Sequence, residues 1–341
     1  MSPSGNGTED HKNIMKEAVD SFGRVHRSLR VSVTDRCNLR CQYCMPEEGL
    51  PCAPRAELLT FEEIVVVVEV AVSMGIDRVR ITGGEPLLRR ELPKLIAMLK
   101  RETGVKDLAM TTNGLLLERH AQALVEAGLD RINISLDSLR PERFEKITRF
   151  GLMEKAWRGI EAASEAGLAP IRINTLLLDG FNDDEVDDWL ELVRNHEIDV
   201  RFMELMPIGE GAELTRLGDY LDLTALKDRL VEEKGLEPAD GERGNGPARY
   251  WRVPGSKGRI GFITPISNSY CNSCSRMRLT SMGELRACLA YDDHVDIRGA
   301  IRKRDREAIR QGVAKALGGK PAGHKWRSGQ ITEAGMSALG G

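Results

Sequence analysis

Short segments rich in β-branched residues alternate with longer helical patterns across the first two thirds of the chain, and this alternation constrains the fold most strongly. The predicted strands are residues 30–34, 78–82, 108–112, 131–135, 172–178 and 200–204. Six strand-then-helix units in series predict an α/β fold, in which a parallel sheet with right-handed crossovers is closed or nearly closed into a barrel. A doubly wound open sheet is the alternative.

The segment after Thr60 is ambiguous, because Ile64-Val65-Val66-Val67-Val68 alone is typical of a strand. Thr60-Phe61-Glu62-Glu63 has the form of a capping box, and the apolar stretch that follows is too long for a strand. We therefore predict a helix here. Further helices are expected at 118–127 and 184–195.

Changes in composition divide the chain into three parts. Residues 1–27 begin with Gly, Ser, Asn and charged residues, which indicates a flexible polar leader. The strand–helix alternation occupies residues 28–234. Residues 235–258 are rich in Gly, Pro and charge, and a second cysteine group follows them. Residues 235–341 are therefore expected to form a C-terminal α+β extension.

Charge and composition exclude several classes of function. A net charge of −3 and an aromatic content of 5% argue against a nucleic-acid-binding or anionic-membrane-binding surface. The longest apolar run, residues 64–72, is interrupted by Glu69 and is too short to cross a bilayer. The polar N-terminus lacks the pattern of a secretion signal. We expect a cytoplasmic protein, whose seven cysteines are metal ligands or catalytic groups rather than disulfides.

Cys37, Cys41 and Cys44 follow the first predicted strand directly, within eight residues. Three thiolates on a tight loop can hold three irons of a cubane cluster and leave the fourth iron open to a small molecule. A structural zinc site needs a fourth ligand, and none lies nearby, since Cys52 falls outside the loop. A plain electron-transfer cluster also normally has four cysteines.

This x3-x2 spacing, with Tyr43 before the last cysteine, resembles the signature of the radical S-adenosylmethionine (SAM) superfamily. Gly83-Gly84-Glu85-Pro86, after the second strand, is similar to the motif that receives the methionyl amino group of SAM. The resemblance implies an incomplete parallel (β/α)6 TIM-like barrel and a 4Fe-4S cluster on Cys37, Cys41 and Cys44. It also implies cofactor contacts from Tyr43, Gly84, Ser135 and Met206. Alternatives are a helix N-cap for Ser135 and simple packing for Met206.

Cys271, Cys274 and Cys288 form a second group of three. Ligand count alone leaves open a zinc site completed by His294. Several separated motifs resemble one branch of the superfamily, the GTP 3′,8-cyclases (the MoaA family) of molybdenum-cofactor biosynthesis. These motifs are Val33-Thr34-Asp35-Arg36-Cys37-Asn38, Ile81-Thr82-Gly83-Gly84-Glu85-Pro86-Leu87, Thr111-Thr112-Asn113-Gly114, Ser135-Leu136-Asp137, Cys274-Ser275-Arg276-Met277-Arg278 and the terminal Gly340-Gly341. The resemblance implies a second 4Fe-4S cluster that binds guanine, with His294 a bystander, and a double-glycine tail that reaches the active site.

Arginines interrupt strands that should be nearly continuous apolar runs in a parallel barrel. Charged guanidinium groups in such positions need anions, and their forked geometry matches phosphate oxygens. Pairing with a local carboxylate such as Asp77, Asp199 or Glu204 is the alternative for each arginine. The cyclase resemblance implies contacts to GTP from Arg30, Arg80, Thr111, Arg172, Arg201, Arg276 and Arg278.

The resemblance further implies a lyase reaction in which a 5′-deoxyadenosyl radical removes the ribose H3′ of GTP and the carbon radical attacks guanine C8. Arg276 and Arg278 are expected to assist reduction after ring closure. The implied partners are GTP, an unidentified low-potential electron donor and, functionally, cyclic pyranopterin monophosphate synthase; the oligomeric state stays open, with a homodimer included. Rival hypotheses are a radical enzyme acting on a peptide or another small molecule and a non-enzymatic iron–sulfur electron carrier.

Overall fold

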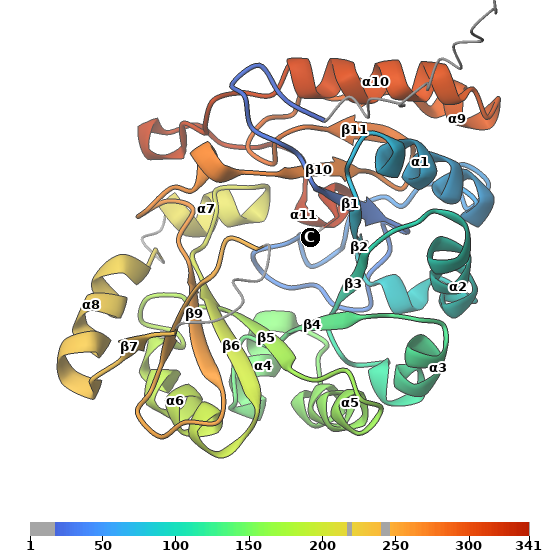
Figure 1. The fold of residues 1–341 in the computed structure, drawn as a ribbon. Coiled ribbons are helices and arrows are strands. Elements are labelled where there is room, and N and C mark those ends of the chain that lie inside the picture. The colour runs from blue at the N-terminus through green and yellow to red at the C-terminus, as the bar shows by residue number, and fades with distance from the viewer. Residues whose placement is uncertain (1–17, 217–219, 240–245, 341) are drawn as a thin grey trace, which may run out of the picture.

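The computed structural model describes residues 18–216, 220–239 and 246–340 (Figure 1). Their strands form one sheet in the order β12-β11-β10-β1-β2-β3-β4-β5-β6-β9-β8-β7. The strand bounds are β1 (Ser28–Ser32), β2 (Arg78–Thr82), β3 (Asp107–Thr112), β4 (Arg131–Ser135), β5 (Ile171–Leu176), β6 (Ile198–Met203), β7 (Glu237–Pro238), β8 (Arg249–Arg252), β9 (Arg259–Ile263), β10 (Arg276–Leu279), β11 (Glu284–Arg286) and β12 (Val295–Asp296).

The sheet curves into a barrel that hydrogen bonds do not close, because its two ends are the short strands β12 and β7 (Figure 1). Strands β1 to β6 pair in parallel in chain order. The predicted α/β class and incomplete parallel barrel are therefore confirmed. Several strands begin or end a few residues from their predicted limits, whereas β2 and β4 span the predicted residues.

The C-terminal part of the chain adds strands to both sides of this six-stranded unit. Strand β10 pairs in parallel with β1, and β9 pairs in parallel with β6. Antiparallel hairpin partners then flank each side, β11 next to β10 and β8 next to β9. Residues after 235 therefore extend the barrel sheet itself, and the domain boundary between 234 and 235 stays a prediction.

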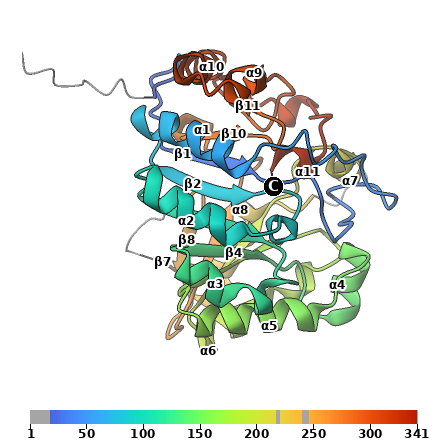
Figure 2. The same cartoon turned by 90° about the vertical axis from the view of Figure 1, so that its right-hand side faces the viewer.

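Helices cover the outer face of the sheet (Figures 1 and 2). The helices of the described residues are α1 (Phe61–Ser73), α2 (Leu92–Glu102), α3 (Ala121–Glu126), α4 (Pro141–Thr148), α5 (Met153–Glu165), α6 (Val186–Asn195), α7 (Glu210–Arg216), α8 (Leu223–Lys234), α9 (Arg298–Arg302), α10 (Arg306–Gly318) and α11 (Met336–Leu339). Helix α10 lies against α1, so the C-terminal segment covers the side of the barrel where the chain begins (Figure 2). No helix in the described ranges has the length and apolar character needed to span a bilayer.

Helix α1 begins at the predicted capping box. The Thr60 backbone N–H donates to Glu63 Oε2 (2.7 Å), and the Glu63 N–H donates to Thr60 Oγ1 (3.3 Å). These reciprocal bonds satisfy two N–H groups that the first helical turn leaves without partners, so the valine-rich segment continues as a helix. Its apolar side chains from Ile64 to Val68 are buried in the main core.

Strand β2 shows how the alternation of side chains creates an interior site. Val79 and Ile81 are buried in the main hydrophobic core. Arg78 and Arg80 alternate with them and line a cavity inside the barrel. Successive side chains of a strand point to opposite faces. The apolar side chains on the outer face therefore pack against the helices, and the polar side chains on the inner face line the cavity.

Residues 18–27 differ from the flexible leader expected for residues 1–27. Ala18 is buried, and its N–H donates to the Met74 carbonyl (2.9 Å). Asp20 and His26 are also buried, with His26 Nε2 and Asp20 Oδ2 3.0 Å apart. The segment is ordered by these buried polar contacts, which its composition does not reveal. Residues 1–17 lie outside the described ranges.

Candidate active site

The first cysteine loop borders a cavity of about 280 Å³ inside the barrel. Cys37, Cys41 and Cys44 all line it, and the loop follows β1 as predicted. Backbone bonds from the Cys44 and Met45 N–H groups to the Cys41 carbonyl hold the turn (2.8 and 3.2 Å). This places the loop among the carboxyl ends of parallel strands, where barrel enzymes carry their catalytic groups.

Burial raises the pKa of the Cys37 thiol to about 11 and that of the Cys44 thiol to about 12. It also raises the pKa of Cys41 well above its ordinary value. Thiols in such surroundings ionise when a metal cation replaces their protons. Three partly buried cysteines line one cavity, and their free thiolates are unfavourable. They therefore fit an iron–sulfur cluster, with Cys37, Cys41 and Cys44 as its ligands.

Gly84 lies where its backbone passes close to the segment that leads into the cysteine loop. A Cβ at this position would lie 2.3 Å from the Arg36 carbonyl oxygen, so a side chain cannot be accommodated. The Gly84 N–H donates to the Thr34 carbonyl (2.8 Å). Gly84 also lines the cavity, and its contact with the cofactor stays a prediction.

The neighbouring Glu85 has a different environment from the one its motif suggests. Its carboxylate is buried and accepts hydrogen bonds from the Leu87 N–H (3.0 Å), Thr112 Oγ1 (2.8 Å) and the Asn113 N–H (2.8 Å). These bonds join the end of β2 to the end of β3. Glu85 therefore braces the two strand ends, and it lines the main cavity together with Gly84.

Tyr43 is held by a residue to which sequence analysis assigned no role. The Tyr43 hydroxyl donates to Asp137 Oδ2 (2.7 Å), and the Leu176 N–H donates to Asp137 Oδ1 (2.9 Å). Asp137 is buried and lines the main cavity, as do Ser135 and Met206. The motif Ser135-Leu136-Asp137 was the available signal, but only the structure shows that Asp137 reaches the cysteine loop.

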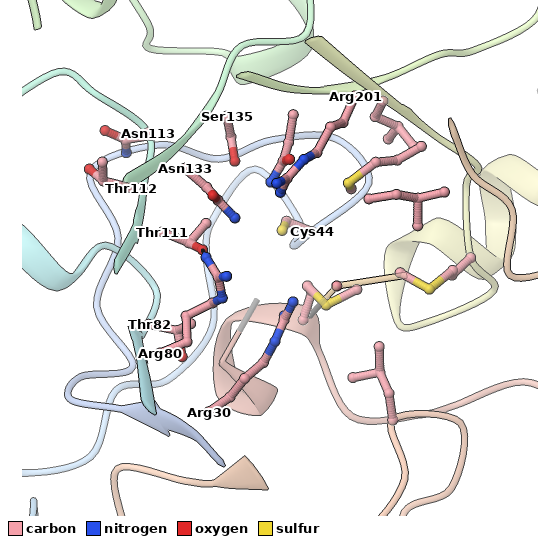
Figure 3. A pocket seen from close by; sticks show the side chains of 18 of the residues that line it. Arg30, Cys44, Arg80, Thr82, Thr111, Thr112, Asn113, Asn133, Ser135 and Arg201 are labelled. Atoms are coloured by element: carbon pink, nitrogen blue, oxygen red, sulfur yellow. Dashed lines mark hydrogen bonds between the residues drawn. The ribbon is translucent and has the colours of Figure 1, made fainter. Parts of the chain in front are cut away.

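Arginines from separate strands converge on the same cavity. Figure 3 shows Arg30, Arg80 and Arg201 directed into one space beside Cys44. Burial, with neighbouring arginines, lowers the pKa of Arg30 to about 10 and that of Arg80 well below its usual range. Arg80 Nη1 also donates to Thr111 Oγ1 (3.4 Å). Burial and mutual repulsion disfavour the positive charges of these arginines. An anionic ligand would compensate for this cost, so the cluster indicates an anion-binding site.

Arg172 is placed differently from the other predicted GTP contacts. The residues that line the cavity include Arg30, Arg80, Thr111, Arg201, Arg276 and Arg278, but not Arg172. Its Nε lies 3.9 Å from Asp199 Oδ2, and Asp199 also binds Arg259 (2.9 and 2.6 Å). The local-carboxylate alternative therefore applies to Arg172. Its contact with GTP stays a prediction.

The second cysteine group borders an adjoining cavity. Cys271, Cys274 and Cys288 line it together with Lys320 and His324, two residues that sequence analysis missed. The two cavities share the residues Met206, Pro265, Tyr270, Arg276, Arg278 and Leu289. The two cysteine groups, more than 200 residues apart in the sequence, therefore border adjoining cavities that share a wall formed by these six residues.

Electrostatics differ between the two groups. Burial opposes ionisation of Cys271, but hydrogen bonding with His324 lowers its pKa to about 6. Burial likewise opposes ionisation of Cys274, and the charges of Arg276 and Lys320 lower its pKa to about 7. Burial raises the pKa of Cys288. Three cysteines in a partly cationic pocket fit a second iron–sulfur cluster, whose ligands would be Cys271, Cys274 and Cys288.

His294 does not complete a zinc site in the described part of the chain. Its side chain is 41% exposed, with Nδ1 3.2 Å from the Asp292 carbonyl and Nε2 3.6 Å from Glu284 Oε1. No group of three or more described His, Cys, Asp or Glu side chains has the arrangement to hold a single metal ion.

The C-terminal helix α11 lies inside the curve of the barrel (Figure 1). Met336 and Ser337 line the main cavity. A Cβ on Gly340 would lie 2.7 Å from Thr82 Oγ1 and 3.2 Å from Ser32 Cβ. Gly340 is therefore tightly fitted against β1 and β2, whereas Gly341 lies outside the described residues.

Comparisons with known proteins agree with these features. Residues 31–193 match the model of the radical SAM superfamily, and residues 198–326 match the model described as Molybdenum Cofactor Synthesis C. The chain is 49% identical over 309 residues to the GTP 3′,8-cyclase of Heliobacterium modesticaldum, covering 90% of this chain and 94% of that one. It is 43% identical over 332 residues to the GTP 3′,8-cyclase of Peptoclostridium acidaminophilum, covering 97% and 100%.

Solved structures show the same fold at low sequence identity. Streptococcus suis SuiB bound to the precursor peptide SuiA has a TM-score of 0.55 at 13% identity, covering 93% of this chain and 77% of that one. SuiB bound to S-adenosylmethionine has a TM-score of 0.52 at 15% identity, covering 78% and 60%. Two family models in tandem and near-full-length relatives above 40% identity decide the classification. The chain belongs to the GTP 3′,8-cyclase family of the radical SAM superfamily.

Proposed function

We propose that this chain is a GTP 3′,8-cyclase that converts GTP to (8S)-3′,8-cyclo-7,8-dihydroguanosine 5′-triphosphate, the first step of molybdenum cofactor biosynthesis. The cofactors are two 4Fe-4S clusters and SAM. The single observation that carries the proposal is the shared wall between two cysteine-lined cavities, with arginines around it. The cavity with the first cysteine group can hold the radical source, and the cavity with the second can hold a nucleotide base. The arginines between them can bind a triphosphate.

The first cysteine loop and its neighbours hold the radical source. Cys37, Cys41 and Cys44 are the ligands of the first cluster, and Gly84, Ser135 and Met206 line the space for SAM. Tyr43 is fixed against this space by its bond to Asp137 (2.7 Å). When bound, the cluster and SAM supply the radical that removes the ribose H3′. The surrounding cavity limits access of water to that radical.

The arginines and the second group orient the substrate. Arg30, Arg80 and Arg201 face the cavity from three different strands and bind phosphate oxygens, with Thr111 beside Arg80. Cys271, Cys274 and Cys288 hold the cluster that binds guanine. Fixing the base and the phosphates at separate points brings the ribose C3′ near guanine C8, which converts ring closure into a positioned intramolecular step.

Arg276 and Arg278 lie in the shared wall and take part at the catalytic centre. Arg276 Nη2 lies 3.8 Å from Cys274 Sγ, and its guanidinium lies 4.9 Å from the centre of the Tyr270 ring. A cation in contact with the second cluster's ligand is suited to assist the reduction that follows ring closure. The proposal further includes an external low-potential electron donor, a functional link to cyclic pyranopterin monophosphate synthase, a cytoplasmic location and a homodimer as the oligomeric state to test.

An anaerobic assay tests the proposal. The reconstituted protein should contain about eight irons per chain, as two cubane clusters require. With dithionite, SAM and GTP it should release 5′-deoxyadenosine and a cyclised GTP product. Iron near four with zinc near one would overturn the second cluster, and 5′-deoxyadenosine with unaltered GTP would overturn the cyclase activity. Turnover of a substrate other than GTP would support the rival radical enzyme.

A further inference from the structure

Lys320 is a buried lysine at the second cysteine group. Its exposed fraction is 3%, and it lies two residues beyond the end of α10, where its N–H donates to the Leu317 carbonyl (3.1 Å). It lines the second cavity together with Cys271, Cys274 and Cys288. Burying a lysine costs free energy, so its position needs a compensating interaction.

The ammonium group joins two segments that carry cysteines. Nζ donates to the carbonyl oxygen of Arg276 (2.7 Å), two residues beyond Cys274. It also donates to the carbonyl oxygen of Ala287, which directly precedes Cys288. Both acceptors are neutral backbone groups. The two bonds orient the segments around the cavity but leave the positive charge of Lys320 without a neutralising partner.

Within the described residues, Lys320 forms no ion pair with an aspartate or glutamate. Burial lowers its pKa, and the nearby Arg24 and Arg276 act in the same direction. The groups that favour its charged form are Cys274 and Cys288. The positive charge of Lys320 is therefore stabilised by the sulfur atoms of two cysteines when these carry negative charge, as they do as thiolate ligands.

We propose that Lys320 is a positioning residue and the counter-charge of the second iron–sulfur cluster. It holds the Cys274 and Cys288 segments in place and raises the cluster's reduction potential. A cluster becomes more negative when it gains an electron, so a fixed cation nearby stabilises the reduced form more than the oxidised form. This inference rests on the proposed function, because it requires that the second group holds a cluster.

The test isolates the second cluster in the full chain. Cys37, Cys41 and Cys44 are replaced by serine, so that about four irons per chain remain, and the midpoint potential is measured by a redox titration followed by electron paramagnetic resonance. Lys320→Met removes the charge and both donors, and Lys320→Gln removes the charge but keeps two N–H donors. We expect both to shift the one-electron equilibrium at least tenfold toward the oxidised form, which is 59 mV more negative.

Two further variants complete the experiment. Lys320→Arg keeps the charge and should keep the potential near that of the triple-serine protein that retains Lys320. Lys315→Met removes an exposed lysine of α10 and should leave the potential unchanged. If Lys320→Met fails to retain iron, the midpoint potential of Lys320→Gln tests the proposal instead. An unchanged potential in an uncharged, iron-loaded variant would overturn the role of Lys320 alone. If the triple-serine protein that retains Lys320 bound no iron at the second cysteine group, the proposed function would be overturned as well.

Discussion

The guanidinium group of Arg278 binds the backbone of Gly340. Arg278 Nη1 donates to the Gly340 carbonyl oxygen (2.8 Å) and to the Leu339 carbonyl oxygen (3.1 Å). Arg278 is 7% exposed and lies in the wall shared by the two cavities. The arginine predicted to contact GTP therefore also holds the C-terminal segment inside the barrel. The predicted contact with GTP would couple tail position and substrate binding through this one side chain.

Gly340→Ala is expected to lower the rate of cyclised product formation by on the order of tenfold, with iron content retained. The added Cβ would meet Thr82 Oγ1 at 2.7 Å, and the φ of +75° disfavours any side chain. The tail must then move away from Arg278. Product formation in the anaerobic assay measures the effect.

Gly329→Ala is the matched control for that substitution. Gly329 has a φ of +89°, and a Cβ there would meet nothing within 4 Å. It therefore tests backbone strain near the C-terminus without the steric conflict. A similar loss of activity in both variants would contradict a specific role for the fit of Gly340.

Asp137→Asn is expected to weaken SAM binding roughly tenfold, because it replaces the charged acceptor of the Tyr43 hydroxyl bond. Tyr43→Phe removes the same bond from the other side and should have a similar effect. Equilibrium binding of SAM to the reconstituted enzyme is the measurement. If the double variant lost as much affinity as the two single losses combined, the two residues would act independently and the coupling would be refuted.

Arg201→Met and Arg172→Met distinguish a cavity arginine from one placed beside a carboxylate. Arg201 lines the main cavity, and its Nε donates to the Tyr250 hydroxyl (2.5 Å). Arg172 lies near Asp199 (3.9 Å) and is absent from that lining. We expect KM for GTP to rise roughly tenfold or more for Arg201→Met, as for loss of a charge-assisted phosphate contact, and clearly less for Arg172→Met. The reverse order would reassign the phosphate site to Arg172.

Glu85→Gln is expected to change the pH dependence of stability. Burial raises the pKa of Glu85 to about 7 from 4.5. Between these pH values the folded state keeps a proton that the unfolded state has lost, so the stability contributed by Glu85 falls as pH rises from about 4.5 to about 7. Glutamine cannot ionise, so the variant should lose less unfolding free energy between pH 5 and pH 8, by about 1–3 kcal/mol.

Chemical denaturation at the two pH values measures this difference. Glutamine also replaces one acceptor oxygen by an NH2 group opposite the donors of Leu87, Thr112 and Asn113. The variant should therefore be less stable at pH 5, by about 1–3 kcal/mol, and this deficit should shrink toward pH 8. Equal losses of stability with rising pH in both proteins would show that Glu85 does not retain its proton in the folded state.

The strand–helix alternation favoured a parallel barrel over a doubly wound open sheet, and the capping box at Thr60 predicted α1. Both signals are local, because helix and strand periodicity and the capping bonds involve residues a few positions apart. The positions of β9 and β10 beside β6 and β1 were not predictable in the same way. Their pairing joins segments far apart in sequence, and a short strand carries no signal of its partner.

The sequence by itself determined the two cysteine triplets, the glycine-rich turn and the arginines, because residue type and spacing limit which ligands and anions a chain can bind. The tertiary structure alone decided which of these groups meet. It brought Asp137 to Tyr43, Lys320 to the second cysteine group and Gly340 to Arg278, and it left Arg172 beside Asp199. These contacts depend on strand register and side-chain direction across the barrel, which are set by packing of the whole chain rather than by neighbours in sequence.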